Sequence, residues 1–344
     1  MNTHCSVPAK LILSGEHAVL YQCPALSMAI NLKTHCRASF QSNPESILTL
    51  KLVNFQQEYH FTFDERRAKA VEIEQRFQLF TQNKTAIESV LTNPIDLILV
   101  VLHHFEKLTP LKTGQWQLSI ESEAPIGRGL GSSAAVIVSL LSALIKQHEL
   151  PFTRKDLLDL ALQIECRQHG KSSGIDPATI IVGGLLQYHT DQPFELFESG
   201  ALNAWLVDTG KPLSSTGQCV EFVKTHHASN QTLWAEFAKT TQQMATSWQA
   251  EDRLGFNQAI QHNHQLLIQI GVVPAKVQQF ISTLEQQYHA VAKTCGAGAI
   301  SGENAGMVLV ISEQAPVELC QTYQYPYYPL SLDDQGVLCE TFNE

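Results

Sequence analysis

Hydrophobic and polar residues alternate along the chain in two ways, which predict strands in some segments and helices in others. Short apolar runs at residues 11–13 and 25–30 are typical of strands, and residues 37–40 and 47–53 continue the strand-like pattern. Between residues 116 and 120 apolar and polar residues alternate, which predicts a half-buried strand. From residue 136 to residue 145 the apolar residues recur at helical spacing, which predicts a helix with one buried face.

Helix-start and helix-end signals predict a second helix from about Thr153 to Gln168. Thr153 can cap its start together with Asp156, and Gly170 follows its end. Farther along, strands are predicted at 205–207 and 307–311, and residues 218–292 are predicted to be mostly helical. Because strands and helices mix throughout, we predict an α+β or α/β class with two domains, residues 1–195 and 196–344.

Composition narrows the class of protein further. Hydrophobic residues make up 44% of the 344 residues and charged residues 16%, so the chain can bury a core. The formal charge of −10 and the lack of a basic cluster argue against nucleic-acid binding. No apolar run is long enough for a membrane span, and the N-terminus lacks a signal-peptide pattern. The eight cysteines are scattered without a Cys-x-x-Cys pair, so we expect reduced thiols and a cytoplasmic location.

A glycine-rich run at residues 125–135 carries the most chemical information. Its three alternating glycines allow the backbone to approach a ligand closely, and the following helix directs its N–H groups and positive dipole end at the loop. These features predict a phosphate site, to which the serines add hydroxyl groups for phosphate or Mg²⁺. The alternative is a tight turn with Ser132 or Ser133 as an ordinary N-cap. The run has neither the Walker signature nor the spacing of a dinucleotide-binding loop.

The run Pro-x-Gly-x-Gly-Leu-Gly-Ser-Ser-Ala resembles the ATP-binding loop of the GHMP kinases, and two other segments resemble motifs of the same superfamily. Residues 6–21 resemble its first motif, in which a Lys precedes a strand and Gly-Glu-His follows. The form Gly-Glu-His-Ala-Val is similar to that of the mevalonate kinases, although Ala9 stands where the family usually has Gly. Residues 165–176 resemble the stretch of the mevalonate kinases that carries two functional carboxylates.

The resemblance implies a two-domain fold, with an N-terminal ATP-binding domain and a C-terminal ferredoxin-like α+β domain. It also implies ATP and Mg²⁺ as cofactors. The implied ATP-binding residues are Gly127, Gly129, Leu130, Gly131, Ser132, Ser133 and Ala134.

Roles for the other site residues follow from the same resemblance. Asp176 takes the position of the catalytic base, and Lys10 that of the residue stabilising the developing charge. Glu16 and His17 take the positions of substrate-binding residues. The Mg²⁺ ligands would be Ser133 and Glu165, with Ser132 as the close competitor for the serine role. From the residues alone, Glu165 could equally be a solvated helix residue, and Asp176 only an N-cap before Pro177.

The implied reaction is phosphoryl transfer from ATP to (R)-mevalonate, giving 5-phosphomevalonate for isoprenoid synthesis. Mevalonate would be the small-molecule partner, and because such kinases are often dimeric, a homodimer is a further expectation. Residues 295–306 depart from the third glycine motif of the superfamily, so phosphomevalonate kinase or another GHMP kinase is the alternative within the enzymes. A GHMP-fold ligand sensor without turnover is the alternative outside them, and retention of Lys10 and Asp176 argues against it.

Overall fold

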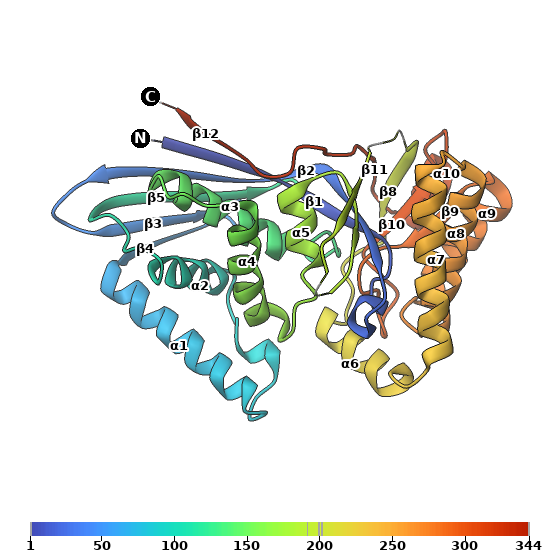
Figure 1. The fold of residues 1–344 in the computed structure, drawn as a ribbon, viewed down its shortest axis with the longest axis horizontal. Coiled ribbons are helices and arrows are strands. Elements are labelled where there is room, and N and C mark those ends of the chain that lie inside the picture. Colours follow the sequence, from blue (N-terminus) through green and yellow to red (C-terminus); the bar gives the residue numbers. More distant parts are fainter. Residues whose placement is uncertain (1, 191, 199, 201, 343–344) are drawn as a thin grey trace.

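Two β-sheets organise the molecule in the computed structural model, which describes residues 2–342 except 191, 199 and 201 (Figure 1). The larger sheet has eight strands; six follow the order β12-β1-β2-β5-β3-β4, while β6 pairs with β2 and β7 with β6. Strands β3 and β5 are parallel and the other pairs are antiparallel. The strands of this sheet are β1 (Asn2–Ser14), β2 (Ala25–Ser42), β3 (Ile47–Leu52), β4 (Gln57–Thr62), β5 (Gly114–Ser122), β6 (Leu185–Tyr188), β7 (Glu195–Phe197) and β12 (Leu338–Phe342).

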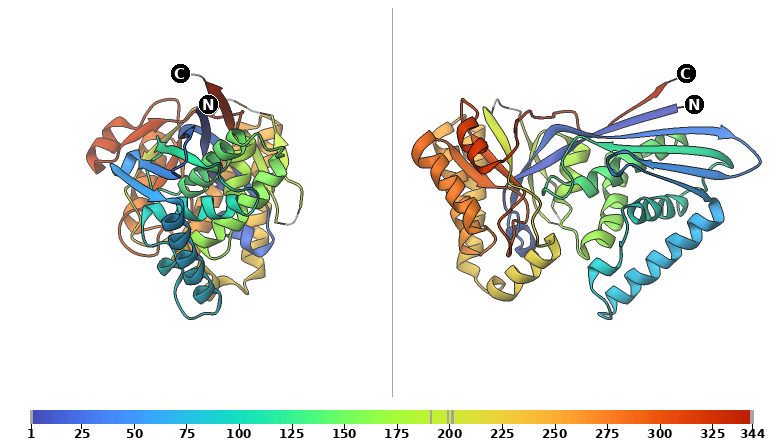
Figure 2. Two further views of the ribbon diagram at one scale, coloured as in Figure 1. Left: turned by 90° about the vertical axis from the view of Figure 1, so that its left-hand side faces the viewer. Right: turned by 180° about the vertical axis from the view of Figure 1, so that it is seen from behind.

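Helices cover one face of the larger sheet, as Figure 1 and the rear view in Figure 2 show. The alternation predicted for residues 116–120 is confirmed, since Trp116, Leu118 and Ile120 are buried on the helix side of β5. The helices are α1 (Phe63–Thr81), α2 (Pro94–Glu106), α3 (Ser132–Gln147), α4 (Arg154–His169) and α5 (Ile175–Val182), with the short 3₁₀ turns η1 (Ala18–Tyr21), η2 (Val53–Phe55) and η3 (Ile87–Ser89).

The smaller sheet belongs to a ferredoxin-like unit. Its strands follow the antiparallel order β11-β8-β10-β9, which is the 4-1-3-2 order of a β-α-β-β-α-β chain path. This confirms the fold predicted for the C-terminal domain. Its strands are β8 (Ala204–Asp208), β9 (Val291–Thr294), β10 (Met307–Ile311) and β11 (Tyr327–Pro329), and its helices are α6 (Thr216–His227), α7 (Gln231–Gln249), α8 (Arg253–Gln269), α9 (Ala275–Tyr288) and α10 (Val317–Tyr323).

Several predicted element boundaries differ from those in the structure. The strands predicted at 25–30 and 37–40 form one continuous strand, β2, because it pairs along its length with β1. Helix α4 has the expected capping box between Thr153 and Asp156. Strand β9 begins at Val291, inside the segment predicted to be helical. The predicted boundary after residue 195 falls within β7, which pairs with the larger sheet, and the division into domains stays a prediction.

The chain closes on itself through a disulfide between its first and last strands. Cys5 and Cys339 face each other in the β1–β12 pair and are bonded, so the expectation of reduced thiols is wrong for these two. The two cysteines are 334 residues apart, so their pairing could not be predicted from the sequence. Only the return of β12 beside β1 brings the two thiols together. Among the helices that the structure describes, none is long and apolar enough to cross a membrane.

Candidate active site

A cleft of about 860 Å³ brings together the segments that the sequence singles out. The end of β1, the glycine-rich loop before α3 and the segment between α4 and α5 all line it. The loops that follow β8 and β9 of the smaller sheet also line it. The cleft therefore lies between the two sheets, and residues from both ends of the chain line it.

The glycine-rich loop adopts the backbone that its composition predicts. Gly127, Gly129 and Gly131 have φ angles of 72°, 82° and 74°, a region that side chains disfavour. Gly131 is the N-cap of α3, so Ser132 and Ser133 lie in the first turn of the helix and neither is the N-cap. A side chain at Gly131 would place its Cβ 2.8 Å from Lys10 Cγ. This glycine therefore lets the loop and the helix N-terminus approach Lys10.

The other residues predicted for the loop divide between backbone and side-chain roles. The side chain of Leu130 is fully buried, and its carbonyl accepts a hydrogen bond from the Lys10 amide at 3.1 Å. Ala134 is also buried within α3. Only their backbone groups can serve a ligand, whereas Ser132 and Ser133 are partly exposed at the cleft.

Lys10 and Asp176 form an ion pair in the cleft. Lys10 Nζ lies 3.0 Å from Asp176 Oδ1, and the lysine side chain is 4% exposed while the aspartate is 24% exposed. Asp176 is the second residue of α5, whose N-cap is Gly174, so the N-cap role suggested by Pro177 is wrong. A buried ammonium needs a partner, and the more open carboxylate keeps one side accessible from the cleft.

Glu165 is the second carboxylate of the cleft, and it is almost fully buried. It accepts a hydrogen bond from Ser172 Oγ. Burial raises the pKa of the Glu165 carboxyl to about 8, and the neighbouring Asp176 charge adds to the rise. Ser133 Oγ lies 3.4 Å from the ring nitrogen Nε2 of His169, and burial lowers the pKa of that histidine.

The side chains of Glu16 and His17 are also buried, and each has a polar atom without a hydrogen-bond partner among the described residues. These atoms are Glu16 Oε2 and His17 Nδ1. The other carboxylate oxygen of Glu16 pairs with Lys293 of β9, and His17 Nε2 lies 3.0 Å from the Ala297 carbonyl oxygen. The sequence analysis missed Lys293. A signal was present, because a lysine stands three residues before the glycine at 296, as Lys10 stands five residues before Gly15.

The altered glycine segment at residues 295–306 packs directly against the glycine-rich loop at residues 125–135. A side chain at Gly129 would place its Cβ 3.2 Å from the Cys295 carbonyl oxygen, and one at Gly296 would lie 3.0 Å from Gly129 Cα. Arg128 joins the loop to β8, because its Nε donates to both carboxylate oxygens of Asp208 at 2.7 and 2.9 Å. The departures of residues 299–304 thus leave the contact between the two loops intact.

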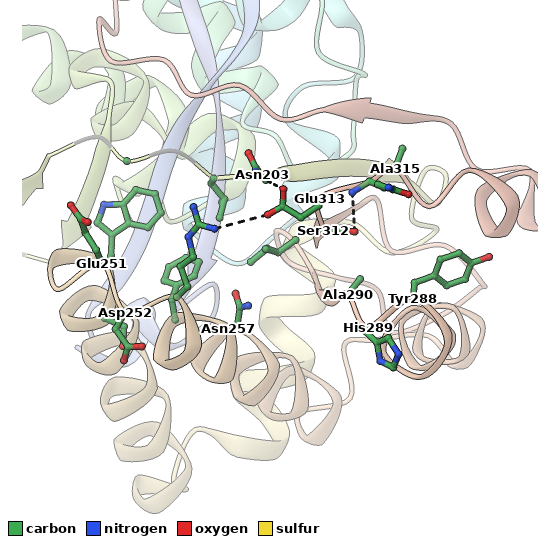
Figure 3. Close-up of a pocket in the computed structure, with 18 of the residues that line it drawn as sticks. Asn203, Glu251, Asp252, Asn257, Tyr288, His289, Ala290, Ser312, Glu313 and Ala315 are labelled. Atoms are coloured by element: carbon green, nitrogen blue, oxygen red, sulfur yellow. Dashed lines mark hydrogen bonds and ion pairs between the residues drawn. The ribbon is translucent and has the colours of Figure 1, made fainter.

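A second cavity, of about 1280 Å³, lies at the other end of the smaller sheet (Figure 3). Glu313 in its wall accepts a hydrogen bond from Asn203 and lies 4.0 Å from Arg253. Its lining includes none of the residues predicted for phosphate, substrate or metal binding. The predicted chemistry is therefore concentrated in the smaller cleft.

Comparison with known proteins shows which proteins this chain and its fold resemble. Residues 96–184 match the family model for the GHMP kinases N terminal domain. A mevalonate kinase of Pyrococcus abyssi is 29% identical over 308 residues, which span 85% of each chain. The solved mevalonate kinase of Methanococcus jannaschii has a TM-score of 0.77 at 20% identity, covering 96% of this chain and 98% of its own. The galactokinase of Lactococcus lactis complexed with galactose has a TM-score of 0.74 at 16% identity, covering 98% and 95%.

Residues 96–184 thus match the GHMP kinases N terminal domain, as the motifs predicted, and the chain as a whole is similar in sequence and fold to mevalonate kinases. Curated relatives that match the chain over most of its length include mevalonate kinases. The two structural likenesses, at 20% and 16% identity, show the shared fold and do not distinguish between acceptors.

Proposed function

We propose that the chain is a mevalonate kinase, which transfers the γ-phosphoryl group of ATP to the primary hydroxyl of (R)-mevalonate. The observation that carries the proposal is the Lys10–Asp176 pair, held at 3.0 Å beside the glycine-rich N-terminus of α3. Phosphoryl transfer needs mainly positioning and neutralisation of charge, and this arrangement offers both. The similarity to the Pyrococcus abyssi enzyme supports mevalonate as the acceptor.

In the proposed reaction, the first turn of α3 binds the ATP phosphates through its free backbone N–H groups. The acceptor hydroxyl attacks the γ-phosphorus in line with the leaving ADP oxygen, and Asp176 takes the hydroxyl proton. Lys10, already within 3.0 Å of Asp176, stabilises the negative charge on the attacking oxygen and the phosphoryl oxygens.

Ser133 and Glu165 are the proposed Mg²⁺ ligands. Their oxygen atoms are of the type that Mg²⁺ prefers. Burial raises the pKa of the Glu165 carboxyl, and a cation bound beside it would lower that pKa by stabilising the carboxylate. When bound, Mg²⁺ would neutralise charge on the β- and γ-phosphates. Among the described residues no group of three or more His, Cys, Asp and Glu side chains gathers, so the nucleotide and water would complete the coordination.

The polar groups of the cleft favour an unphosphorylated hydroxy acid as acceptor. Glu16 Oε2 and His17 Nδ1 are buried with no partner among the described residues, and a hydroxyl group can satisfy either atom. A phosphorylated acceptor would need additional cations. Arg128 is already bound to Asp208, and Arg167, which does not line the cleft, is bound to Glu74. Lys171 and Lys211 also line the cleft and can bind the carboxylate of a hydroxy acid, so the assay with 5-phosphomevalonate decides between the two acceptors.

A coupled assay of ADP release with Mg·ATP tests the proposal. Mevalonate, 5-phosphomevalonate, galactose and homoserine are compared in parallel, and we expect turnover on mevalonate alone. Turnover on another acceptor would refute the mevalonate assignment while leaving the kinase class intact. Nucleotide binding without turnover on any acceptor would favour the sensor.

The variant Asp176→Asn tests the assigned base in the same assay. We expect turnover to fall by about 10²- to 10⁴-fold, the usual contribution of general base catalysis, with nucleotide binding retained. Turnover near the wild-type rate would refute the role of Asp176.

A further inference from the structure

Lys293 is a fully buried lysine that connects the smaller domain to the turn bearing Glu16. It lies in β9 with 0% exposure, and its ammonium group pairs with the Glu16 carboxylate, which is 1% exposed. Its Nζ also donates to the Ile12 carbonyl oxygen at 3.1 Å. Both partners lie near the end of β1, 277 and 281 residues away in the sequence.

The local backbone explains why these acceptors are available to Lys293. The pairing of β1 with β2 shifts register between Ile12 and Ser14, which interrupts the regular ladder near the Ile12 carbonyl. Gly15 then turns the chain with a φ of 93°, and a side chain there would place its Cβ 2.6 Å from Ala25 Cα. The turn is thus packed closely, and Glu16 leaves it directed at β9.

The ion pair uses only half of the Glu16 carboxylate. One oxygen binds Lys293, whereas Oε2 has no hydrogen-bond partner among the described residues, and Glu16 lines the cleft. An acceptor oxygen that is buried and unpaired is costly, and a donor hydroxyl on a bound ligand would satisfy it. A buried ion pair adds little net stability compared with apolar packing. The orientation of the Glu16 carboxylate is therefore a better explanation for the Lys293–Glu16 pair than stability.

We propose that Lys293 is a positioning residue for the acceptor. It holds Glu16 so that Oε2 faces the cleft and accepts a hydrogen bond from a hydroxyl group of the acceptor molecule. Because Lys293 belongs to the smaller domain and Glu16 to the larger sheet, the same contact sets the spacing of the two domains around the acceptor. The inference rests on the proposed kinase function of the cleft, but it does not depend on which hydroxylated acceptor is used.

The test compares Lys293→Met and Lys293→Arg with the wild type, using whichever acceptor the wild type phosphorylates. A hydrogen bond to a charged group contributes about 10- to 100-fold to binding. We therefore expect Lys293→Met to raise the acceptor KM by about that factor, while the dissociation constant of Mg·ATP changes less than about twofold. Lys293→Arg keeps the charge and should recover most of the loss. Equal weakening of acceptor and nucleotide binding by Lys293→Met would overturn the proposal.

Two control variants distinguish a loss of acceptor positioning from a general loss of protein stability. Ser14→Ala removes buried contacts to Thr241 and Asn263 at the same domain boundary without touching Glu16. Arg66→Met breaks a buried ion pair with Glu106 away from the cleft. We expect either control to lower the melting temperature and leave the acceptor KM unchanged. An acceptor KM raised as much by Ser14→Ala as by Lys293→Met would overturn the proposal.

A double variant keeps the test decisive if Lys293→Met fails to fold. Glu16→Gln with Lys293→Met removes both charges and leaves no unpaired ion in the core. If Lys293 acts through Glu16, the double variant and Glu16→Gln alone have the same acceptor KM. Additive effects of the two substitutions would contradict the inference. Absence of turnover by the wild type on every acceptor would instead count against the proposed function.

Discussion

The buried carboxyl of Glu165 makes the stability of the ligand-free protein dependent on pH. Its pKa rises from an ordinary value of 4.5 to about 8, first because of burial and then because of the Asp176 charge. The folded protein therefore holds this proton more tightly than the unfolded chain does. The resulting stabilisation is fully present below pH 4.5 and is lost as the pH rises through about 8. At about 1.4 kcal/mol for each unit of pH, the loss reaches about 5 kcal/mol at most.

Urea unfolding of the wild type and of Glu165→Gln from pH 5.5 to 8.5 measures this contribution. The amide is neutral at every pH, so the variant should gain stability relative to the wild type by up to about 1.4 kcal/mol per pH unit. Glu106→Gln is the control, because the pKa of Glu106 is lowered beside Arg66 and Arg67 and this carboxyl titrates below the range. Parallel stability curves for Glu165→Gln and the wild type would refute the reasoning.

Three further predictions concern the loop, the ion pair and the disulfide. Gly131→Ala places a Cβ 2.8 Å from Lys10 Cγ, whereas the Cβ of Gly127→Ala meets only the flexible end of Lys211 at 3.4 Å. We therefore expect kcat to fall at least about tenfold more for Gly131→Ala than for Gly127→Ala. Equal losses of kcat would contradict this expectation. Lys10→Met should lower kcat by about 10²- to 10³-fold in the coupled assay, and near-wild-type turnover would exclude its charge-stabilising role. Thiol titration of the denatured, unreduced protein should find two fewer thiols than titration after reduction. Cys5→Ser should abolish that difference, because it leaves Cys339 as a free thiol. Equal thiol counts before and after reduction would disprove the disulfide.

Residues that act through local backbone chemistry were predictable from the sequence. The glycines of the loop at 127–131 have the positive φ angles that their spacing implies, because this backbone depends on the residues themselves. The capping box of α4 is equally local, since Thr153 and Asp156 are three residues apart.

Helices α1 and α2 show where pattern reasoning fails. In α2 nearly every residue from Ile95 to Phe105 is buried, so no polar face reveals helical periodicity. In α1 only four residues are buried and most of the others are exposed, which leaves a weak apolar stripe. A helix is recognised from one sequence when its two sides differ, and neither of these helices meets that condition.

The sequence by itself determined the backbone of the glycine loop, the Lys10 and Asp176 motifs and the similarity to the GHMP kinases, because each depends on a short run of neighbouring residues. Only the tertiary structure decided which distant groups meet. The pairing of Lys293 with Glu16 and the bond between Cys5 and Cys339 join residues 277 and 334 positions apart. Such contacts depend on how two sheets and the returning β12 pack together, and no local pattern encodes that packing. Burial likewise decided the raised pKa of Glu165, because desolvation depends on the surrounding core.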